Sequence, residues 1–410
     1  MQDNEKKPAL RFKGFTDPWE QRKLAELTKT ITTGKSVNSD EGEVSDGDIG
    51  VLKTSCVSYD RFNPSESKPV VKSEQQLVKC AVEKDSVIVS RMNTPERVGA
   101  CGYVSTDFPN LFLPDRLWKL KFQDTVDTYF VYMMLVSSAY KEKITSMASG
   151  TSGSMYNIPK ETFLNLQLVI PAKIDEQKQL GRILKKIDSL ITLHQRKYEK
   201  LVNIKKSMLD KMFPKNGASV PEIRFKGFTD PWEQRKLGEI AKEVVRNDPA
   251  SDAPIMMITA GNGFIEQSDR YAFNNAGESL KKYILLERGE LAYNHGASKL
   301  RPYGSCFALT TVEKARIPFV YHCFSVEKSN PEFLSIELNG ANVENQLRKI
   351  VSSGARMDGL LNIAYSEYTE VTVQLPKKEE QDWIAKFFKH LDTLITLHQR
   401  KLEKLQNIKK

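Results

Sequence analysis

The polar side chains that could do chemistry in this 410-residue sequence gather in short loops and form no catalytic cluster. Arg, Lys, Asn and Gln carry fixed sets of donors and acceptors that match the edges of DNA bases, whereas Ser, Thr and backbone N–H groups suit phosphate oxygens. In the first half of the chain we expect DNA contacts from two loops, at Arg91, Asn93, Arg97, Thr151, Ser152, Ser154 and Tyr156. In the second half the matching loops supply Asn294, His295, Ser298, Lys299, Arg301 and Arg356.

Motifs of catalytic chemistry are absent or incomplete. The run Gly34-Lys35-Ser36 resembles the end of a phosphate-binding loop, but Lys29 stands where the first glycine is required. The sequence has no Asn-Pro-Pro-aromatic run, which an adenine methyltransferase would carry. Pro114-Asp115 could begin a nuclease motif, but its nearest acidic-x-Lys partner, residues 176–178, begins a helix, and the counterpart at 380–382 has no lysine. His, Cys and carboxylate residues form no cluster typical of a metal site. We therefore predict a non-catalytic chain that holds no metal and no cofactor.

Two internal repeats define the elements that must position these loops. Residues 11–24 read RFKGFTDPWEQRKL, and residues 224–237 repeat all fourteen letters at an offset of 213. We call this stretch the leading motif. A second pair, 188–206 and 392–410, is identical at 16 of 19 positions at an offset of 204. The order of the matches indicates a tandem duplication, in which each half has a leading motif, a variable body and a long helix.

The two bodies differ for most of their length but share a rhythm. In each, a strand-like run (85–91 or 289–294) leads into a Gly-containing loop, and a Gly/Ser loop follows later (149–154 or 352–356). Each body closes with a period-two strand that ends in proline, at Leu166–Pro171 and at Val371–Pro376. The similar frame around dissimilar inserts indicates that the frame has a constant role and the inserts a variable one.

Both long helices show an apolar heptad seam, which predicts a coiled coil. The simplest partner for each helix is the other copy, packed antiparallel, which would place the two bodies at opposite ends of a pseudo-two-fold arrangement. The residues that we expect at this helix-pair interface are Ile187, Leu190, His194, Leu201, Leu391, Leu394, His398 and Leu405. The predicted fold class is α+β, with two domains of mixed sheet and helices separated by the helix pair.

Two features of this frame allow more than one interpretation. His194 and His398 occupy equivalent positions on the seam, where a polar residue can fix the helix register; a pH switch or metal pair is the alternative. The aromatic residues of the leading motif, Phe12, Phe15 and Trp19, are interpreted as a packing plug between body and helix, with a base-stacking platform as the alternative. The charged helix faces are interpreted as solvated or partner-binding surface rather than a DNA groove.

Composition permits nucleic-acid binding and locates the positive charge. The net charge is +9, and residues 173–215 hold 12 Lys/Arg against 5 Asp/Glu, while residues 377–410 hold 9 against 5. The remainder of the chain is close to neutral. Five cysteines at irregular spacing, with no Cys-x-x-Cys pair, disfavour a zinc site or a disulfide framework. A polar N-terminus without a secretory signal and the lack of a membrane-length apolar run favour a reduced, cytoplasmic protein that contacts no membrane.

The sequence resembles the specificity subunit of type I restriction–modification systems. Three features carry the resemblance: the twin leading motifs, the Pro-to-Glu-Gln junctions at 171–177 and 376–381, and the repeated helical motifs at 188–206 and 392–410. The resemblance covers essentially the whole chain. It implies two target recognition domains that each read one part of a split duplex DNA site, and paired helices that set their spacing. It also implies two methyltransferase subunits that bind S-adenosylmethionine, and motor-nuclease restriction subunits, as partners. One departure is that the first helix continues through residues 207–213, whereas the second copy ends at Lys410.

The expected domains are a first recognition domain at 1–172, a central helix at 173–215, a second recognition domain at 216–376 and a C-terminal helix at 377–410. A helix of about 35 residues is roughly 50 Å long, which suits two reading heads about one DNA turn apart. A non-catalytic coiled-coil adaptor that binds no DNA is the alternative function. A self-sufficient restriction or methylation enzyme is a third, which the missing motifs disfavour.

Overall fold

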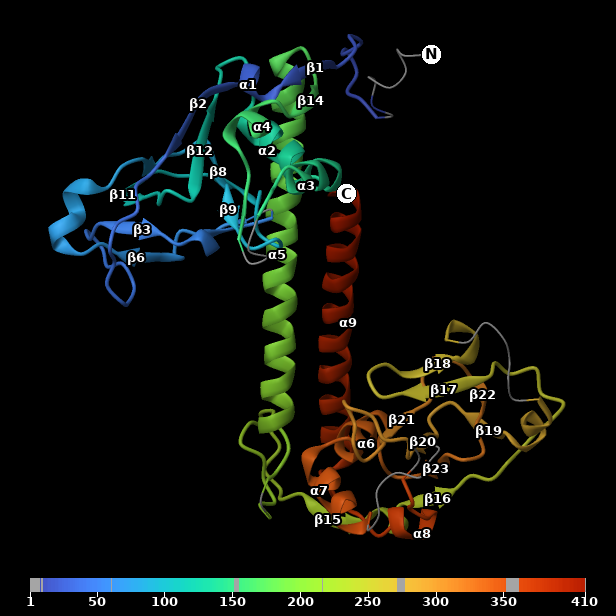
Figure 1. The fold of residues 1–410 in the computed structure, drawn as a ribbon. Coiled ribbons are helices and arrows are strands. Elements are labelled where there is room, and N and C mark those ends of the chain that lie inside the picture. Colours follow the sequence, from blue (N-terminus) through green and yellow to red (C-terminus); the bar gives the residue numbers. More distant parts are fainter. Residues whose placement is uncertain are drawn as a thin grey trace. The chain divides into compact units, whose positions relative to one another are not determined.

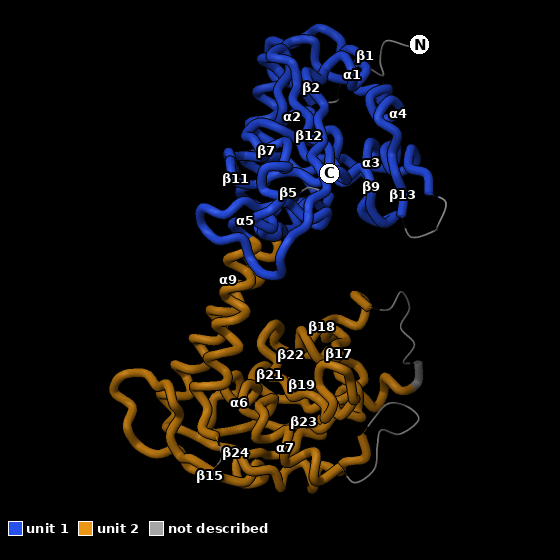
Figure 2. Tube along the Cα trace, turned by 60° about the vertical axis from the view of Figure 1, so that its left-hand side comes forward, with its two compact units in different colours: residues 1–194, 401–410 blue, residues 195–400 orange. Residues whose placement is uncertain are grey.

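The computed structural model in Figure 1 describes residues 8, 10–59, 61–150, 155–215, 217–270, 277–351 and 361–409. The chain divides into two compact units, which Figure 2 colours separately. Unit 1 comprises residues 1–194 and 401–410, and unit 2 comprises residues 195–400. Each unit holds one body together with segments of both long helices, and each is described by itself.

Unit 1 contains two four-stranded sheets, and an interior strand of the first is fully buried. One four-stranded sheet has the order β10 (Cys101–Val104), β8 (Ser86–Ser90), β12 (Leu117–Phe122), β2 (Thr28–Thr33). All five residues of β8 are buried, which fits its β-branched run in a central position. A second sheet has the order β6 (Ser67–Pro69), β3 (Gly50–Leu52), β11 (Phe108–Phe112), β7 (Ala81–Val82). Short pairs complete the strands: β1 (Glu20–Lys23) with β14 (Gln167–Ile170), β9 (Met92–Asn93) with β13 (Tyr156–Asn157), and β4 (Val57–Ser58) with β5 (Arg61–Phe62).

Helices complete the core of unit 1. The described helices of the body are α1 (Leu24–Leu27), α2 (Thr128–Val136), α3 (Ser138–Ser146) and α4 (Lys160–Leu164), with 3-10 turns at Thr54–Cys56 and Lys72–Leu77. The apolar helix α2 has its N-terminus capped by Asp127, which accepts a hydrogen bond from the N–H of Phe130. Phe130 and neighbouring residues of α2 pack into the same core as Leu180 and Leu184 of the first long helix. The body of unit 1 is therefore anchored on the start of that helix.

Unit 2 has a related plan with different details. Its four-stranded sheet has the order β16 (Ala241–Glu243), β23 (His322–Val326), β20 (Leu291–Asn294), β21 (Ser305–Ala308). Three strand pairs accompany it: β17 (Met256–Thr259) with β18 (Gly263–Glu266), β19 (Ile284–Glu287) with β22 (Lys314–Ile317), and β15 (Glu233–Lys236) with β24 (Thr372–Leu375). The body helices are α6 (Pro331–Leu338), α7 (Ala341–Ile350) and α8 (Tyr365–Tyr368), and 3-10 turns lie at Leu237–Glu239, Gln267–Asp269 and Gly277–Lys282.

The two long helices are α5 (Ile174–Lys211) and α9 (Lys378–Lys409). In unit 2, Lys205 of α5 forms an ion pair with Asp392 of α9 at 2.5 Å. In unit 1, Lys409 of α9 forms one with Asp188 of α5 at 2.7 Å. These residues are equivalent under the offset of 204, so each unit contains the same antiparallel pairing. The predicted fold class, α+β with mixed domains and paired long helices, is confirmed.

The expected helix-pair residues lie on the inner faces of the helices. Leu391 is buried, whereas the other seven are half-buried: Ile187, Leu190, His194, Leu201, Leu394, His398 and Leu405. Ile183, an apolar residue one helical turn before Ile187 that the heptad pattern predicts on the seam, is instead 46% exposed. Lys409, the last described residue of α9, pairs with Asp188 of α5, so Ile183 lies past the part of α9 that the structure describes. No helix within the described ranges is both long and apolar enough to cross a membrane.

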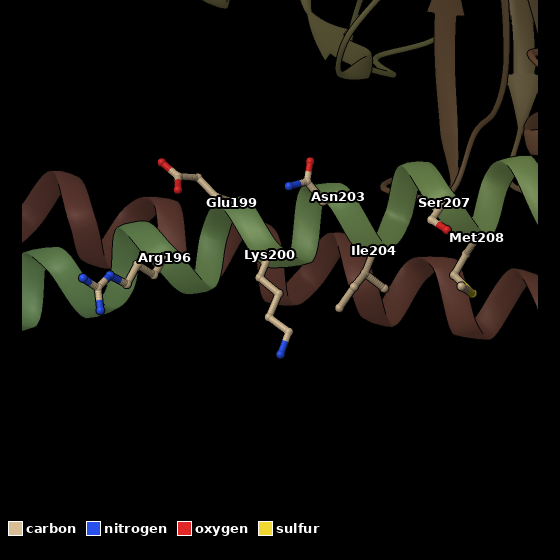
Figure 3. A pocket seen from close by; sticks show the side chains of 7 residues that line it. All are labelled: Arg196, Glu199, Lys200, Asn203, Ile204, Ser207 and Met208. Carbon is tan, nitrogen blue, oxygen red and sulfur yellow. The ribbon is translucent and has the colours of Figure 1, made fainter. Parts of the chain in front are cut away.

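A shallow groove follows α5 within unit 2 (Figure 3). Two cations, an acid, two small polar residues and two apolar residues line it: Arg196, Lys200, Glu199, Asn203, Ser207, Ile204 and Met208. In Figure 3, Glu199 and Asn203 project to one side of the helix while Arg196 and Lys200 project to the other. The groove is therefore amphipathic and suits a protein surface better than an enclosed small molecule.

Candidate nucleic-acid interface

In both units, the residue that follows the central strand holds the loop after it against the segment that follows the Gly/Ser loop in sequence. In unit 1, Arg91 follows β8, and its carbonyl accepts a hydrogen bond from the N–H of Ile158 at 2.9 Å. In unit 2, His295 follows β20, and its carbonyl accepts one from the N–H of Leu361, also at 2.9 Å. Both contacts lie just beyond the Gly/Ser loop. Each unit therefore brings the first of the two predicted loops to the segment that follows the second in sequence.

The loop of unit 1 presents Arg97 to solvent. Arg97 is exposed on a turn in which its N–H donates to the carbonyl of Thr94 at 3.0 Å. Arg91 is half-buried, and its Nε donates to the carbonyl of Asp115 at 2.8 Å. Tyr156 is half-buried on β13, directly across from Asn93 on β9. The exposed guanidinium of Arg97 has the chemistry to contact a base or a phosphate.

Asn93 is a correction to the expected set. Its side chain is buried, and its amide Nδ2 donates to the Ser90 hydroxyl at 3.0 Å. Its Oδ1 accepts a hydrogen bond from the N–H of Thr94 at 2.9 Å. Both ends of the buried amide are therefore engaged in shaping the turn that carries Arg97.

The loop of unit 2 presents Ser298 and Lys299 to solvent. The Ser298 hydroxyl accepts a hydrogen bond from the N–H of Arg301 at 3.0 Å, which closes a tight turn around Lys299. Arg301 is half-buried, and its Nη1 donates to the carbonyl of Asn339 at 2.6 Å. Burial lowers the pKa of Arg301. Arg301 is thus partly committed to holding its own loop against α6, and Lys299 is the freer cation.

His295 and Asn294 are also corrections. His295 is 6% exposed, and its ring nitrogens lie 2.9 Å from the carbonyl oxygen of Leu361 and 2.8 Å from that of Val320. Asn294 is half-buried; its Nδ2 donates to the carbonyl of Ile258 at 3.1 Å, and its Oδ1 accepts from the N–H of Gly296 at 2.9 Å. The His295 ring is therefore committed to its own loops, and the Asn294 amide uses one donor and one acceptor to shape its loop.

Four expected contacts cannot be placed. Thr151, Ser152, Ser154 and Arg356 lie outside the described residues. What the structure adds is the position of the segments that flank them. Ser149 pairs with Asn157 on one loop, and Leu361 is held by His295 at the end of the other.

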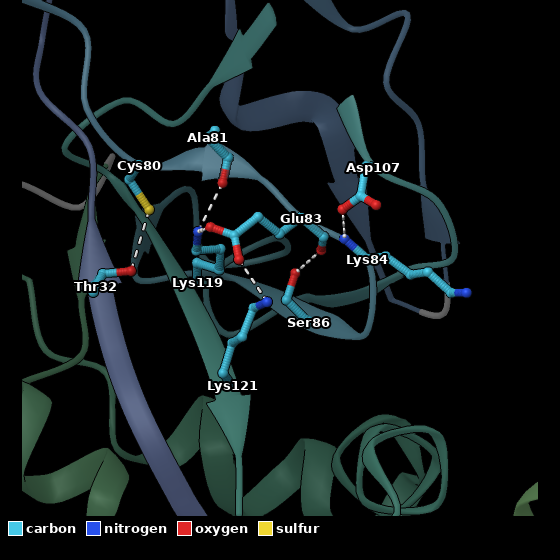
Figure 4. A network of polar contacts seen from close by, with 9 residues as sticks. All are labelled: Thr32, Cys80, Ala81, Glu83, Lys84, Ser86, Asp107, Lys119 and Lys121. Atoms are coloured by element: carbon cyan, nitrogen blue, oxygen red, sulfur yellow. Dashed lines mark hydrogen bonds and ion pairs between the residues drawn. The ribbon is translucent and has the colours of Figure 1, made fainter. Parts of the chain in front are cut away.

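One lysine of unit 1 is buried and has a structural role. Lys119 of β12 is 6% exposed, and its Nζ donates to the carbonyl of Ala81 at 2.8 Å and to the Glu83 carboxylate at 2.6 Å (Figure 4). Lys121 pairs with the other oxygen of Glu83 at 2.5 Å. These two lysines hold the pKa of Glu83 below its usual value. The network connects the two sheets of unit 1.

A clamp between the leading motif and the long helix recurs in both units. Arg11 Nε and Nη2 donate to the two carboxylate oxygens of Glu176, at 2.7 Å each. Arg224 Nε and Nη2 make the same bidentate contact with Glu380, also at 2.7 Å each. Both glutamates are almost fully buried, with side-chain exposures of 2% and 1%. The hydrogen bonds raise the pKa of each arginine. The clamp ties each leading motif to the first turn of its helix.

The glutamine that follows each of these glutamates makes a second recurring contact. In unit 1, Gln177 Oε1 accepts from the N–H of Asp127, and its Nε2 donates to the carbonyl of Pro171. In unit 2, Gln381 Oε1 accepts from the N–H of Asn330, and its Nε2 donates to the carbonyl of Pro376. The same two amide contacts thus seat each body on its helix. From the sequence, these Glu-Gln pairs were weighed as a nuclease element and as part of the family resemblance, and their structural role was missed.

The tryptophans of the leading motif are packing residues, as the sequence predicted. Trp232 is 4% exposed and stacks edge-on against Phe213 and Phe333 at centroid distances of 5.8 Å. Trp19 packs edge-on against Phe130 at 6.1 Å. A base-stacking platform would need open ring faces, so this alternative is excluded for Trp232.

Comparison with known proteins gives consistent matches. Residues 16–203 match the family described as the type I restriction modification DNA specificity domain. The MjaVIII type I restriction enzyme specificity subunit of Methanocaldococcus jannaschii is 25% identical over 316 residues, covering 69% of this chain and 68% of that protein. A putative MjaX specificity subunit of the same organism is 21% identical over 416 residues, covering 96% of this chain and 91% of that protein.

A solved structure shares the fold. The S subunit of a type I restriction–modification system from M. genitalium superposes with a TM-score of 0.58 at 15% identity. The match covers 97% of this chain and 95% of the other.

Proposed function

We propose that this chain is a specificity subunit of a type I restriction–modification system and that it reads a bipartite duplex DNA site, with one body for each part. The match to a DNA specificity domain and to curated specificity subunits supports sequence-specific DNA recognition, and in this proposal the chain itself catalyses no reaction. The proposed recognition domains are residues 1–172 and 216–376. The helical segments 173–215 and 377–410 serve as the spacer between them.

The observation that carries this proposal is the repeated construction of the two loop sites. Arg91 and His295 stand at equivalent positions, and each joins a loop after the central strand to the segment that follows a Gly/Ser loop in sequence. The clamps that seat the bodies on the helices are the same, while the loops differ in sequence. Two domains that each bind a different half-site need the same attachment to the helices and different loops, which is the arrangement found in the two units.

The proposed contacts follow from exposure and hydrogen bonding. Arg97 in the first body and Ser298 and Lys299 in the second are exposed, so we assign the primary DNA contacts to them. The half-buried set contributes at the edge of the interface: Arg91, Tyr156 and Arg301. Thr151, Ser152, Ser154 and Arg356 are retained as contacts from the sequence alone, and Asn93, Asn294 and His295 become positioning residues.

The proposed partners are two methyltransferase subunits, which carry S-adenosylmethionine, and motor-nuclease restriction subunits. The groove on α5 supports a protein partner because it combines charged and apolar side chains on an open helix face. Exposed Leu193 has its duplicate in exposed Leu397, at 46% and 43% exposure. Repeated partner-facing side chains suit two copies of one partner. Five free cysteines accord with the reduced cytoplasmic setting that we propose.

The test is to co-express the chain with a type I methyltransferase subunit and to map methylated adenines in the host genome. We expect a single sequence in two parts separated by a fixed gap of unread bases. The adaptor alternative predicts no site-specific methylation and no salt-dependent binding of duplex DNA by the complex. A continuous, ungapped site would contradict the two-reader proposal.

A further inference from the structure

In unit 2, the turn between β17 and β18 lies against the loop that follows β20. Asn294 Nδ2 donates to the carbonyl of Ile258 at the end of β17. A Cβ placed on Gly261, at the tip of the hairpin, would lie 3.7 Å from Leu300 Cδ2. The hairpin tip and the loop therefore form one continuous surface, although some 35 residues of sequence separate them.

Internal contacts hold both parts of this surface, the tip of the β17–β18 hairpin and the loop after β20. The Thr259 hydroxyl donates to the carbonyl of Gly263 and accepts from the N–H of Asn262, at 3.3 Å each. Gly263 adopts φ +67° directly over the Phe307 ring, a conformation that favours glycine. In the loop after β20, the Ser298 hydroxyl accepts a hydrogen bond from the N–H of Arg301 and closes the turn. A surface fixed in this way can present side chains without paying a large ordering entropy on binding.

Three side chains of different chemistry project from the hairpin tip and the loop after β20. Leu300 is 67% exposed, and Asn262 and Lys299 are also exposed. Within the part of the chain that the structure describes, the Asn262 amide and the Lys299 ammonium have no hydrogen-bond or ion-pair partner. A single exposed leucine is ordinary, but here it sits beside a free amide and a free cation at the tip of a two-stranded ribbon.

This combination fits one base pair in the major groove. The thymine 5-methyl group is the only apolar group that a base pair offers there, and an asparagine amide can bond the N6 and N7 atoms of adenine at once. The major groove admits a two-stranded β-ribbon, whereas the minor groove is about half as wide and displays no methyl group. A lysine beside the bases is placed to meet a phosphate oxygen.

We propose that Leu300 and Asn262 read an A·T pair in the half-site of the second body, with Leu300 against the thymine methyl, Asn262 on the adenine and Lys299 on the backbone. This inference rests on the proposed function. It extends the second reader beyond the loop that the sequence identified, to the β17–β18 hairpin.

The test uses the full chain in complex with its methyltransferase partner and duplexes that carry the mapped site. Exchange of residues 25–165 identifies which half-site belongs to the second body. In that half-site each thymine is replaced in turn by deoxyuridine, which lacks the methyl group, and each adenine by 7-deazaadenine, which lacks N7. Dissociation constants are measured for the wild type, Leu300→Ala, Asn262→Ala and a control, Val245→Ala, whose side chain is 73% exposed in the same unit.

At one position, deoxyuridine should weaken binding by the wild type and Val245→Ala about threefold to tenfold, and leave binding by Leu300→Ala unchanged. Replacement of an adenine at the same or the adjacent pair should affect the wild type and spare Asn262→Ala. Because the side chains of Leu300, Asn262 and Val245 are all exposed, the three variants should fold normally.

Equal sensitivity of the wild type and Leu300→Ala to every deoxyuridine replacement would overturn the inference while leaving the proposed function intact. Equal weakening of both half-sites by Leu300→Ala would also overturn it. A methylation map without any specific site would refute the proposed function itself, and the inference with it.

Discussion

Replacing Arg224 by methionine should destabilise unit 2 strongly. The substitution keeps a long apolar side chain but removes both N–H groups from Glu380, whose side chain is 1% exposed. Breaking a buried ion pair from one side costs about 3–5 kcal/mol, because the remaining charge is buried without a partner. Glu380 lies in the first turn of α9, where the helix dipole offsets about 0.3–1 kcal/mol of that cost. We therefore expect a loss of about 3 kcal/mol, roughly a hundredfold in the unfolding equilibrium.

The assay is urea unfolding followed by tryptophan fluorescence, since Trp232 packs against Phe213 and Phe333 in the core of unit 2. Arg235→Met serves as the matched control. Arg235 pairs with Glu239 at 2.6 Å, but both side chains are more than two-fifths exposed, so its loss should leave the urea midpoint nearly unchanged.

The double variant Arg224→Met/Glu380→Leu is the critical comparison. Because it removes both charges together, it should recover most of the stability that the single substitution loses. A cost below about 1 kcal/mol for Arg224→Met, or additive costs in the double variant, would show that the pair is not a clamp.

Three further predictions follow from single residues. Burial raises the pKa of Glu337 to about 7, so this carboxyl binds a proton more tightly in the folded chain than in the unfolded chain. The stability of unit 2 should therefore fall as pH rises from about 4.5 to 7, and Glu337→Gln should remove this loss in unfolding measured across that range. Lys119→Met should destabilise unit 1 by about 1–3 kcal/mol, because the carbonyl of Ala81 loses its donor; an unchanged melting curve would contradict the network. Lys299→Ala should reduce the slope of log binding constant against log salt by about one, and an unchanged slope would exclude a phosphate contact.

The sequence predicted the frame well because the frame is written twice. The repeats at 11–24 and 224–237 located the leading motifs, and heptad spacing located both long helices. The same comparison contained the clamp, since Arg11 and Glu176 recur as Arg224 and Glu380 at constant offsets. That signal was present but was not interpreted, because a salt bridge between residues more than 150 positions apart needs the fold to bring them together.

The loops were harder to predict. The shared rhythm of the bodies located the loops, but it predicted neither the contacts that the structure shows beside them nor the exposure of single side chains. Asn93 and His295 have the right chemistry for DNA and are buried, because the loops fold back on them. Asn262 and Leu300 were overlooked because their proximity depends on the packing of a hairpin that has no counterpart in the repeats.

The most direct test of two independent readers is a methylation map of a chimaera. Residues 25–165 are exchanged for the body of another specificity subunit, while both leading motifs, both clamps and both helices are kept. Methylated adenines are then mapped after co-expression with the same methyltransferase. We predict that one half of the recognised sequence changes and that the other half and the gap length stay the same. A change in both halves would contradict the account.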